Sequence, residues 1–259
     1  MKKKYELTEE TIEVNGRILH RIKAVRDFGC VKSGYLGGFI QKEENLSQEG
    51  NAWVYGDAKV YGDAKVYDNA KVYGDTRVYD DAKVYGDTRV FDNAEVCGNA
   101  KVYGDAKVYD DAKVYGDTRV YDDAKVYGDA KVYDDAKVYG DTWVFGDAKV
   151  YGDTKVFDNA EVCGNAKVYG DTRVYGDARV CGDAEIKNNT DYIVFKNFWS
   201  SGRFFTWTRS NNMWKVGCFY GTGEELIKKA YEDSKKSGRE YERVVRYVES
   251  ILADERKEE

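Results

Sequence analysis

The sequence predicts a mainly β protein whose central body is a parallel β-helix, and three observations carry this prediction. Valine recurs every six residues from Val54 to Val180, and the series closes at Ile186. Val54 and Ile186 are 132 positions apart, so steps of six give 23 hexads when both ends are counted. Within each hexad the side chains alternate as they do along a strand, and each hexad ends in a pair of residues that favours a corner.

The strand part of each hexad has the order small, charged, apolar, aromatic, typically Ala-Lys-Val-Tyr. Because successive side chains of a strand point to opposite faces, Ala and Val share one face and Lys and Tyr the other. We expect Ala and Val to face inward. Threonine replaces the inward alanine in several hexads, so those threonines are also expected inside.

The corner part of each hexad is Gly or Asp followed by Asp or Asn. Glycine, aspartate and asparagine are the residues that most readily adopt left-handed backbone conformations. A meander of hairpins would need glycine first in each two-residue turn, which the Asp-Asn and Asp-Asp hexads disfavour. Three hexads joined into an 18-residue triangular coil, with coils stacked about 4.8 Å apart, satisfy the pattern better.

An aliphatic residue with a small residue two positions before it, repeated from Ala52 to Ile186, resembles the hexapeptide-repeat proteins. That resemblance implies a left-handed parallel β-helix. The preceding segment contains AVRDFG at 24–29, YLGGFI at 35–40 and NLSQEGNAWV at 45–54. These stretches look like the YdcK-like transferases of enterobacteria and their phages, and they imply a phage or prophage setting.

Stacked coils expose unpaired edges at both ends, so we expect each end to be covered. Residues 1–50 alternate short apolar strands with glycine turns and are predicted to form an N-terminal capping segment, with the β-helix at 51–189. Residues 190–259 break the period and are predicted to form a small α+β domain. It would comprise a three-stranded meander with turns at 200–202 and 210–212, a helix capped by Thr222, and a second helix after Gly238.

Composition restricts the classes of partner. The chain has 259 residues, 41 Lys+Arg and 47 Asp+Glu, so it is mildly acidic and no binder of bulk nucleic acid or anionic membrane is indicated. No signal peptide or membrane span is evident, which points to the cytoplasm, of a bacterial host if the chain is phage-encoded. Five cysteines without a CxxC pair and a single histidine disfavour a metal site, and we expect free thiols, including Cys163 and Cys181.

Acyl transfer is the activity that the resemblance to hexapeptide-repeat proteins brings with it. Members with that activity use a loop extruded between coils, a histidine base and coenzyme A bound between subunits of a trimer. Here the hexads follow one another without insertion, and His20 lies before the coils begin. We therefore predict no catalytic residue and no cofactor.

One face of the predicted solenoid is a candidate binding track. A file of cations runs beside a file of aromatic rings, a combination that suits a nucleotide or single-stranded nucleic acid. Corner residues two positions before each cation add six carboxylates and Asn99 against seven cations, which leaves the face nearly neutral. The alternative is that Lys and Tyr simply cover a sheet. The central residues of this track are Lys101, Tyr103, Arg119, Tyr121, Lys137 and Tyr139.

The terminal domain supplies a second candidate surface because it is dense in aromatic residues beside cations. The alternative is a compact core that seals the β-helix. The candidate binding residues are Trp199, Arg203, Trp207, Arg209, Trp214 and Lys215.

These features favour a non-enzymatic scaffold or binding protein. We expect a homo-oligomer, trimer or dimer, which acts by self-association or by binding a protein partner through the terminal domain. A protein that sequesters a nucleotide or small anion is the second hypothesis, and an acyltransferase is the third.

Overall fold

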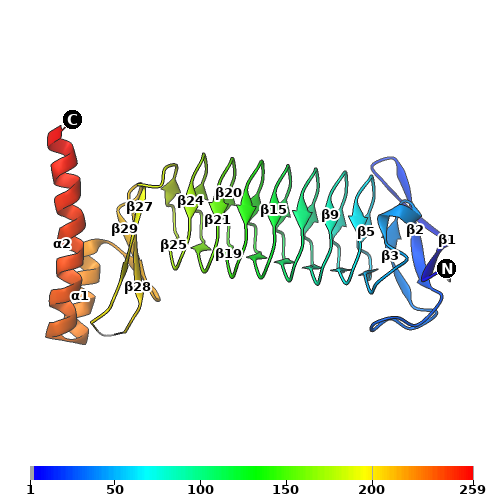
Figure 1. Ribbon diagram of the computed structural model, residues 1–259, viewed down its shortest axis with the longest axis horizontal. Helices are drawn as coiled ribbons and strands as arrows, with labels where there is room; N and C mark the ends of the chain where they lie inside the picture. Colours follow the sequence, from blue (N-terminus) through cyan, green and yellow to red (C-terminus); the bar gives the residue numbers. More distant parts are fainter. Residues whose placement is uncertain (1–2, 200, 259) are drawn as a thin grey trace.

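A computed structural model describes residues 3–199 and 201–258, and these form a long three-sided solenoid with a different unit at each end (Figure 1). The described strands of the solenoid belong to three sheets, one on each side. Sheet 1 contains β1 (Tyr5–Val14), β2 (Arg17–Ala24), β3 (Leu36–Ile40), β5 (Lys59–Val60), β8 (Arg77–Val78), β11 (Glu95–Val96), β14 (Lys113–Val114), β17 (Lys131–Val132), β20 (Lys149–Val150), β23 (Lys167–Val168) and β26 (Glu185–Ile186).

The other two sides are built from two-residue strands alone. Sheet 2 contains β4 (Trp53–Val54), β7 (Lys71–Val72), β10 (Arg89–Val90), β13 (Lys107–Val108), β16 (Lys125–Val126), β19 (Trp143–Val144), β22 (Glu161–Val162) and β25 (Arg179–Val180). Sheet 3 contains β6 (Lys65–Val66), β9 (Lys83–Val84), β12 (Lys101–Val102), β15 (Arg119–Val120), β18 (Lys137–Val138), β21 (Lys155–Val156) and β24 (Arg173–Val174). The predicted parallel β-helix with three hexads per coil is confirmed.

Backbone hydrogen bonds between residues one coil apart hold the solenoid together. The Tyr103 N–H donates to the Val120 carbonyl at 3.0 Å, and the Lys101 N–H donates to the Thr118 carbonyl at 2.9 Å. The same two bonds recur through the coils, so each strand pairs in parallel with the strand 18 residues later.

The interior holds the valines, alanines and threonines predicted to face inward, and all of them are buried. A buried hydroxyl needs a hydrogen-bond partner. Thr118 Oγ1 donates to the Tyr115 carbonyl at 2.7 Å, and the other inward threonines repeat this bond three residues back. Threonine therefore substitutes for alanine inside without leaving an unpaired polar group.

The N-terminal unit combines the β1–β2 hairpin with β3 and a short 3₁₀ helix at Glu43–Asn45. Strand β3 pairs in parallel with β5, and Leu46 pairs with Val66. Residues 36–54 thus already form a coil, and the solenoid begins within the segment predicted as the cap. The buried Lys4 ammonium donates to the carbonyls of Glu49 and Ala52 at 3.1 and 2.9 Å and closes this end.

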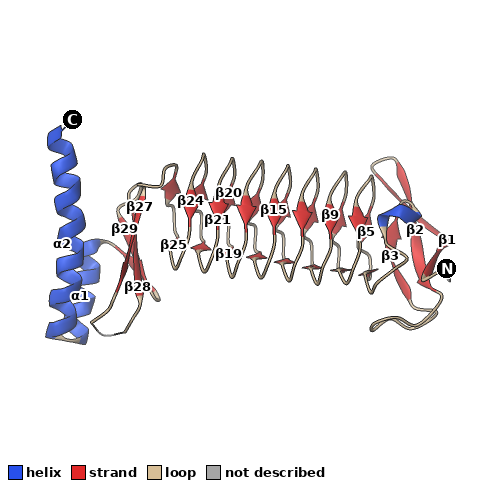
Figure 2. Cartoon of the chain, in the orientation of Figure 1, coloured by secondary structure: helices blue, strands red, loops and turns tan. Residues whose placement is uncertain are grey.

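The C-terminal unit is a small antiparallel sheet covered by two helices on the side away from the coils (Figure 2). The described strands number four, β27 (Tyr192–Lys196), β28 (Phe204–Thr208), β29 (Met213–Val216) and β30 (Phe219–Gly221), so the prediction of three strands was wrong. Helix α1 spans Gly223–Asp233, and Thr222 caps it as predicted. Helix α2 spans Lys235–Glu258 and runs through Gly238, where we had expected it to begin.

Side-chain oxygens from the C-terminal region cap the last strand of each solenoid sheet. The Arg179 N–H of sheet 2 donates to Thr206 Oγ1 at 2.9 Å, and the Glu185 N–H of sheet 1 donates to Ser210 Oγ at 2.7 Å. In sheet 3 the Arg173 N–H donates to Asn189 Oδ1 at 2.8 Å. The three edges that a next coil would occupy are therefore closed by hydrogen bonds.

The expectation of free thiols at Cys163 and Cys181 was wrong, because the two form a disulfide. They lie one coil apart, 18 residues in sequence, with Cα atoms 4.5 Å apart. That separation is within the range a disulfide requires, and coil stacking imposes it. Of the described cysteines, Cys30, Cys97 and Cys218 are unpaired.

Gly104→Ala is expected to destabilise the solenoid by about 1–3 kcal/mol, since Gly104 has a φ of 72° and an added Cβ would lie 2.8 Å from the Asp122 nitrogen. Its neighbour Asp105 is exposed on the same corner, so Asp105→Ala is the matched control and should change stability by less than about 0.5 kcal/mol. Urea unfolding followed by circular dichroism measures both. Equal midpoints for the two variants would contradict the role given to the close approach of successive corners.

Candidate functional site

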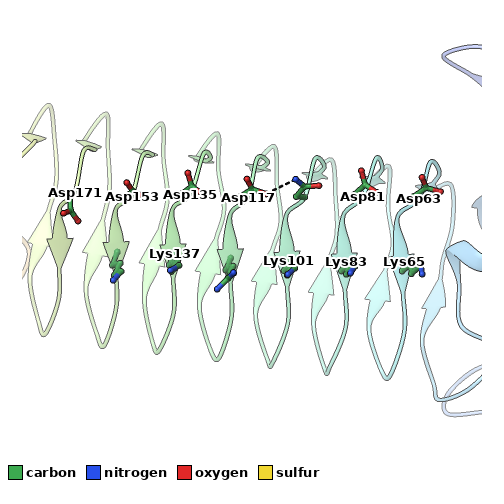
Figure 3. Close-up of a pocket in the computed structure, with 13 residues that line it drawn as sticks. Asp63, Lys65, Asp81, Lys83, Lys101, Asp117, Asp135, Lys137, Asp153 and Asp171 are labelled. Carbon is green, nitrogen blue, oxygen red and sulfur yellow. Dashed lines mark hydrogen bonds between the residues drawn. The ribbon is translucent and has the colours of Figure 1, made fainter.

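The predicted binding track lies on sheet 3, beside a long shallow groove of about 1070 Å³. Figure 3 shows the cations pointing out from the strands and the corner residues forming a second file along the coil edges. The Asn99 amide donates to Asp117 Oδ1 at 2.8 Å along the corner file. The groove is lined by Asp63, Lys65, Asp81, Lys83, Asn99, Lys101, Asp117, Arg119, Asp135, Lys137, Asp153, Lys155 and Asp171.

Charge on sheet 3 differs from charge on the other two sheets. In sheet 1, Glu95 lies between Arg77 and Lys113 and pairs with both, at 3.5 and 3.6 Å. In sheet 2, Glu161 pairs with Arg179 at 3.2 Å. On sheet 3 every strand carries a cation, and within the described chain no ion pair shorter than 4.0 Å joins these cations to the corner carboxylates.

The aromatic rings of the track stack on one another rather than standing free. Tyr103 and Tyr121 have ring centroids 4.9 Å apart with planes 1° from parallel, and Tyr121 and Tyr139 are 4.8 Å apart. A base could stack within this file only by separating two rings that already cover each other's faces. This geometry favours the interpretation in which the tyrosines cover and stabilise the sheet.

Burial changes the acidity of these tyrosines. Burial raises the pKa of Tyr121 to about 12, with further contributions from the neighbouring Tyr139 and Tyr103 and from Asp122. Burial is also the main cause of the raised pKa of Tyr103 and of Tyr139. The phenols of the stack therefore stay protonated well above neutral pH.

The structure does not bring the six candidate residues of the terminal domain together on one surface. Trp207 and Trp214 are 1% and 2% exposed and belong to the core between the sheet and the helices. Their burial contradicts the prediction that these two tryptophans belong to a binding surface. Strand alternation explains the difference, because in β28 Phe205 and Trp207 face the helices while Thr206 faces the last coil.

The remaining four candidates have separate surroundings. Trp199 is partly buried against Phe205 and Tyr241. Arg209 forms a two-bond ion pair with Glu255 of α2 at 2.7 and 3.1 Å. Arg203 is exposed, and Lys215 is partly buried on β29.

The exposed apolar surface of the terminal domain includes residues outside the predicted binding set. Phe198 is 86% exposed in the turn after β27, and Tyr247 on α2 is 57% exposed. Phe198 lies between Asn197 and the Trp199 that precedes the Ser-Ser-Gly turn signal, and this place next to a turn could have identified it.

His20 lies on β2 in the N-terminal unit, and its Nδ1 is 3.2 Å from the Thr8 carbonyl oxygen. It is thus held within the β1–β2 hairpin.

Among the described residues, no three His, Cys, Asp or Glu side chains are grouped so that they could bind a metal ion. None of the helices formed by the described residues is both long enough and apolar enough to cross a membrane.

Stability should fall as pH rises from about 10 towards 12. The tyrosines titrate near 10 when unfolded, and burial raises their pKa in the fold, to about 12 for Tyr121, so the unfolded chain loses protons first. Lys4 acts in the opposite direction from about pH 8, because burial lowers its pKa, but it is one group against a file of tyrosines. Urea midpoints measured from pH 8 to 12 test this, and Tyr121→Phe should make the alkaline loss shallower. A flat profile above pH 10 would contradict it.

Comparison with known proteins supports the fold and leaves the activity open. No protein-family model matches the chain. The chain is 39% identical over 61 residues to a protein of Escherichia coli (strain K12) named "Uncharacterized acetyltransferase YdcK". The match covers 20% of this chain and 19% of that protein, so the chain is similar to a fifth of this relative. Together with the repeats and the solenoid, this similarity supports a hexapeptide-repeat β-helix.

Proposed function

We propose that the protein is a non-enzymatic scaffold or binding protein, a rigid rod that acts through its terminal domain by self-association or by binding a protein partner. The observation that carries this proposal is the unbroken pairing of coils from Val54 to Ile186. Backbone hydrogen bonds and stacked aromatic rings join each coil to the next along this segment. Twenty-three hexads at three per coil, with coils about 4.8 Å apart, make a rod roughly 37 Å long.

A repeated phrase in the rod supports a role for length rather than for a site on its side. FDNAEVCGNAKVYGD occurs at 91–105 and again at 157–171, an offset of 66 residues or eleven hexads. Eleven is not a multiple of three, so the two copies lie on different sides of the solenoid. Glu95 accordingly falls in sheet 1 and Glu161 in sheet 2. Duplication preserved the coil while moving every side chain to a new side.

Acyl transfer is less well supported, although the E. coli relative is named an acetyltransferase. A general base must reach the reacting group, and histidine is the usual choice. His20 is bound within the N-terminal hairpin, and the hexads leave no insertion between Val54 and Ile186 in which an acyl donor could be held. The stretches at 24–29, 35–40 and 45–54 resemble enterobacterial and phage proteins, so the proposal includes a phage or prophage origin.

The terminal domain is the better candidate for contact with a partner because it carries exposed apolar side chains at the end of the rod. Phe198 at 86% exposure is the most exposed large apolar residue in the described chain. Lys196 and Arg203 precede and follow it in sequence, at the two ends of the same turn, and are also exposed. An exposed aromatic residue bordered by cations is typical of an interaction surface.

Native mass spectrometry of the purified protein should show a dimer or trimer whose mass is an integer multiple of the 29.5 kDa chain. Phe198→Glu should shift this assembly to monomer, because it places a charge at the proposed contact. Tyr35→Glu, at an aromatic residue 49% exposed in the N-terminal unit, is the matched control and should leave the assembly intact.

Two results would count against the proposal. The first is a wild-type protein that is monomeric at tens of micromolar and that, when immobilised, captures no protein from a bacterial lysate. This result would contradict both self-association and partner binding. Turnover of an acyl donor such as acetyl coenzyme A that is abolished in His20→Ala would establish the enzyme instead.

A further inference from the structure

A pocket of about 590 Å³ lies where the last coil of sheet 3 meets the edge of the terminal sheet. Its volume is in the range of small-molecule sites, which are roughly 300–1,000 Å³. Side chains from three segments line it, namely the last coil, the linker at 187–191 that joins β26 to β27, and the strands β27 and β28. The residues that matter here are Tyr175, Asp177, Asn189, Tyr192, Val194 and Phe204.

Tyr175 gives the pocket an open aromatic face. It is the last ring of the sheet 3 stack, with Phe157 on one side at 5.4 Å between centroids. No ring of the described chain stacks on its other side, and Tyr175 is 53% exposed. The earlier rings of this file are all partly buried, between two neighbours in most cases. The stack therefore ends in a free flat surface at the pocket.

Asp177 gives the pocket a carboxylate without a donor. The equivalent corner residues from Asp57 to Asp183 are exposed in the other hexads, whereas Asp177 is partly buried. In residues 3–199 and 201–258 its carboxylate takes part in no hydrogen bond or ion pair that would satisfy it. Because this carboxylate is partly shielded from solvent and has no donor within the protein, a ligand that brings N–H donors could form charge-assisted hydrogen bonds with it.

The remaining lining combines apolar side chains with Arg173 and Asn189, and it is already held in place. Val194 and Phe204 line one side, from paired strands of the terminal sheet. The Tyr192 hydroxyl donates to the Arg173 carbonyl at 2.9 Å, and the Asn189 side chain accepts from the Arg173 N–H. These bonds tie the linker and β27 to the last coil, so the pocket is formed before a ligand arrives.

We propose that this pocket binds a purine base of the guanine class, stacked on Tyr175 and paired through its N–H edge with Asp177. Guanine carries two adjacent N–H donors that match the two oxygens of a carboxylate. Adenine places a ring acceptor beside its amino group and would direct that lone pair at Asp177. A guanidinium group has the donors but is too small to cover Val194 and Phe204 as well. This site goes beyond the scaffold role, because the rod can assemble whether or not the pocket is filled.

Isothermal titration calorimetry with guanosine 5′-monophosphate, adenosine 5′-monophosphate and free L-arginine tests the proposal. The guanine nucleotide should bind at least about tenfold more tightly than the adenine nucleotide, as expected for a two-bond base contact. Both nucleotides carry the same phosphate, so attraction to surface lysines cancels in this comparison. Free arginine should bind more weakly than the guanine nucleotide.

Matched variants locate the binding. Tyr175→Ala and Asp177→Asn should each weaken the guanine nucleotide by about tenfold or more, whereas Tyr175→Phe should retain it because the ring face is kept. Tyr85→Ala and Asp141→Asn make the same changes at the equivalent positions of earlier coils and should leave affinity unchanged. Melting curves of all five variants separate loss of binding from loss of fold.

The proposal would be overturned by no heat with millimolar guanine nucleotide, by equal affinity for the adenine nucleotide, or by unchanged affinity in Asp177→Asn. Tighter binding of arginine would also overturn it. The assembly seen by native mass spectrometry is measured separately, so failure here leaves the scaffold proposal standing, and the reverse also holds.

Discussion

The pairing of each residue with the residue 18 positions later is the constraint on which the rest of the structure depends. The Tyr103 N–H reaches the Val120 carbonyl because each coil consists of three hexads, and an insertion of one residue would break both hydrogen bonds of that strand. The chain has no proline, each of which would remove a backbone donor. Corners must also approach closely, as the 2.8 Å between an added Gly104 Cβ and the Asp122 nitrogen illustrates.

The same constraint determines what the outer faces can do. Side chains one coil apart are brought to the spacing at which aromatic rings stack, so Tyr103, Tyr121 and Tyr139 cover one another. Cations are brought equally close, and Glu95 relieves this repulsion in sheet 1 by pairing on both sides. The regularity that resembles a binding track is thus a consequence of coil pairing, and departures from it are more informative about ligands than the repeat itself.

Sequence periodicity predicted the solenoid well because each hexad obeys the same local rule, but it predicted the ends poorly because tertiary packing decides them. Gly238 looked like a helix boundary, yet a Cβ at that position would collide with the Tyr231 ring, so this glycine permits α1 and α2 to pack closely. Trp207 and Trp214 looked available for binding, and only the docking of two helices on one side of the sheet buries them. Cys163 and Cys181 were correctly placed one above the other, but their bonding could not be read from spacing.

The way the solenoid ends explains why a pocket lies there. A flat antiparallel sheet cannot continue three sides of a triangle at once. Strand β28 lies against the end of sheet 2, where Thr206 accepts the Arg179 N–H. Among the described residues no strand lies against the end of sheet 3, and its last strand β24 is capped by the side chains of Asn189 and Tyr192. Side-chain caps satisfy the backbone of β24 without covering the ring of Tyr175 or pairing the carboxylate of Asp177. The least regular corner of the rod is therefore the place where the outer side chains of the repeat are free to meet a ligand.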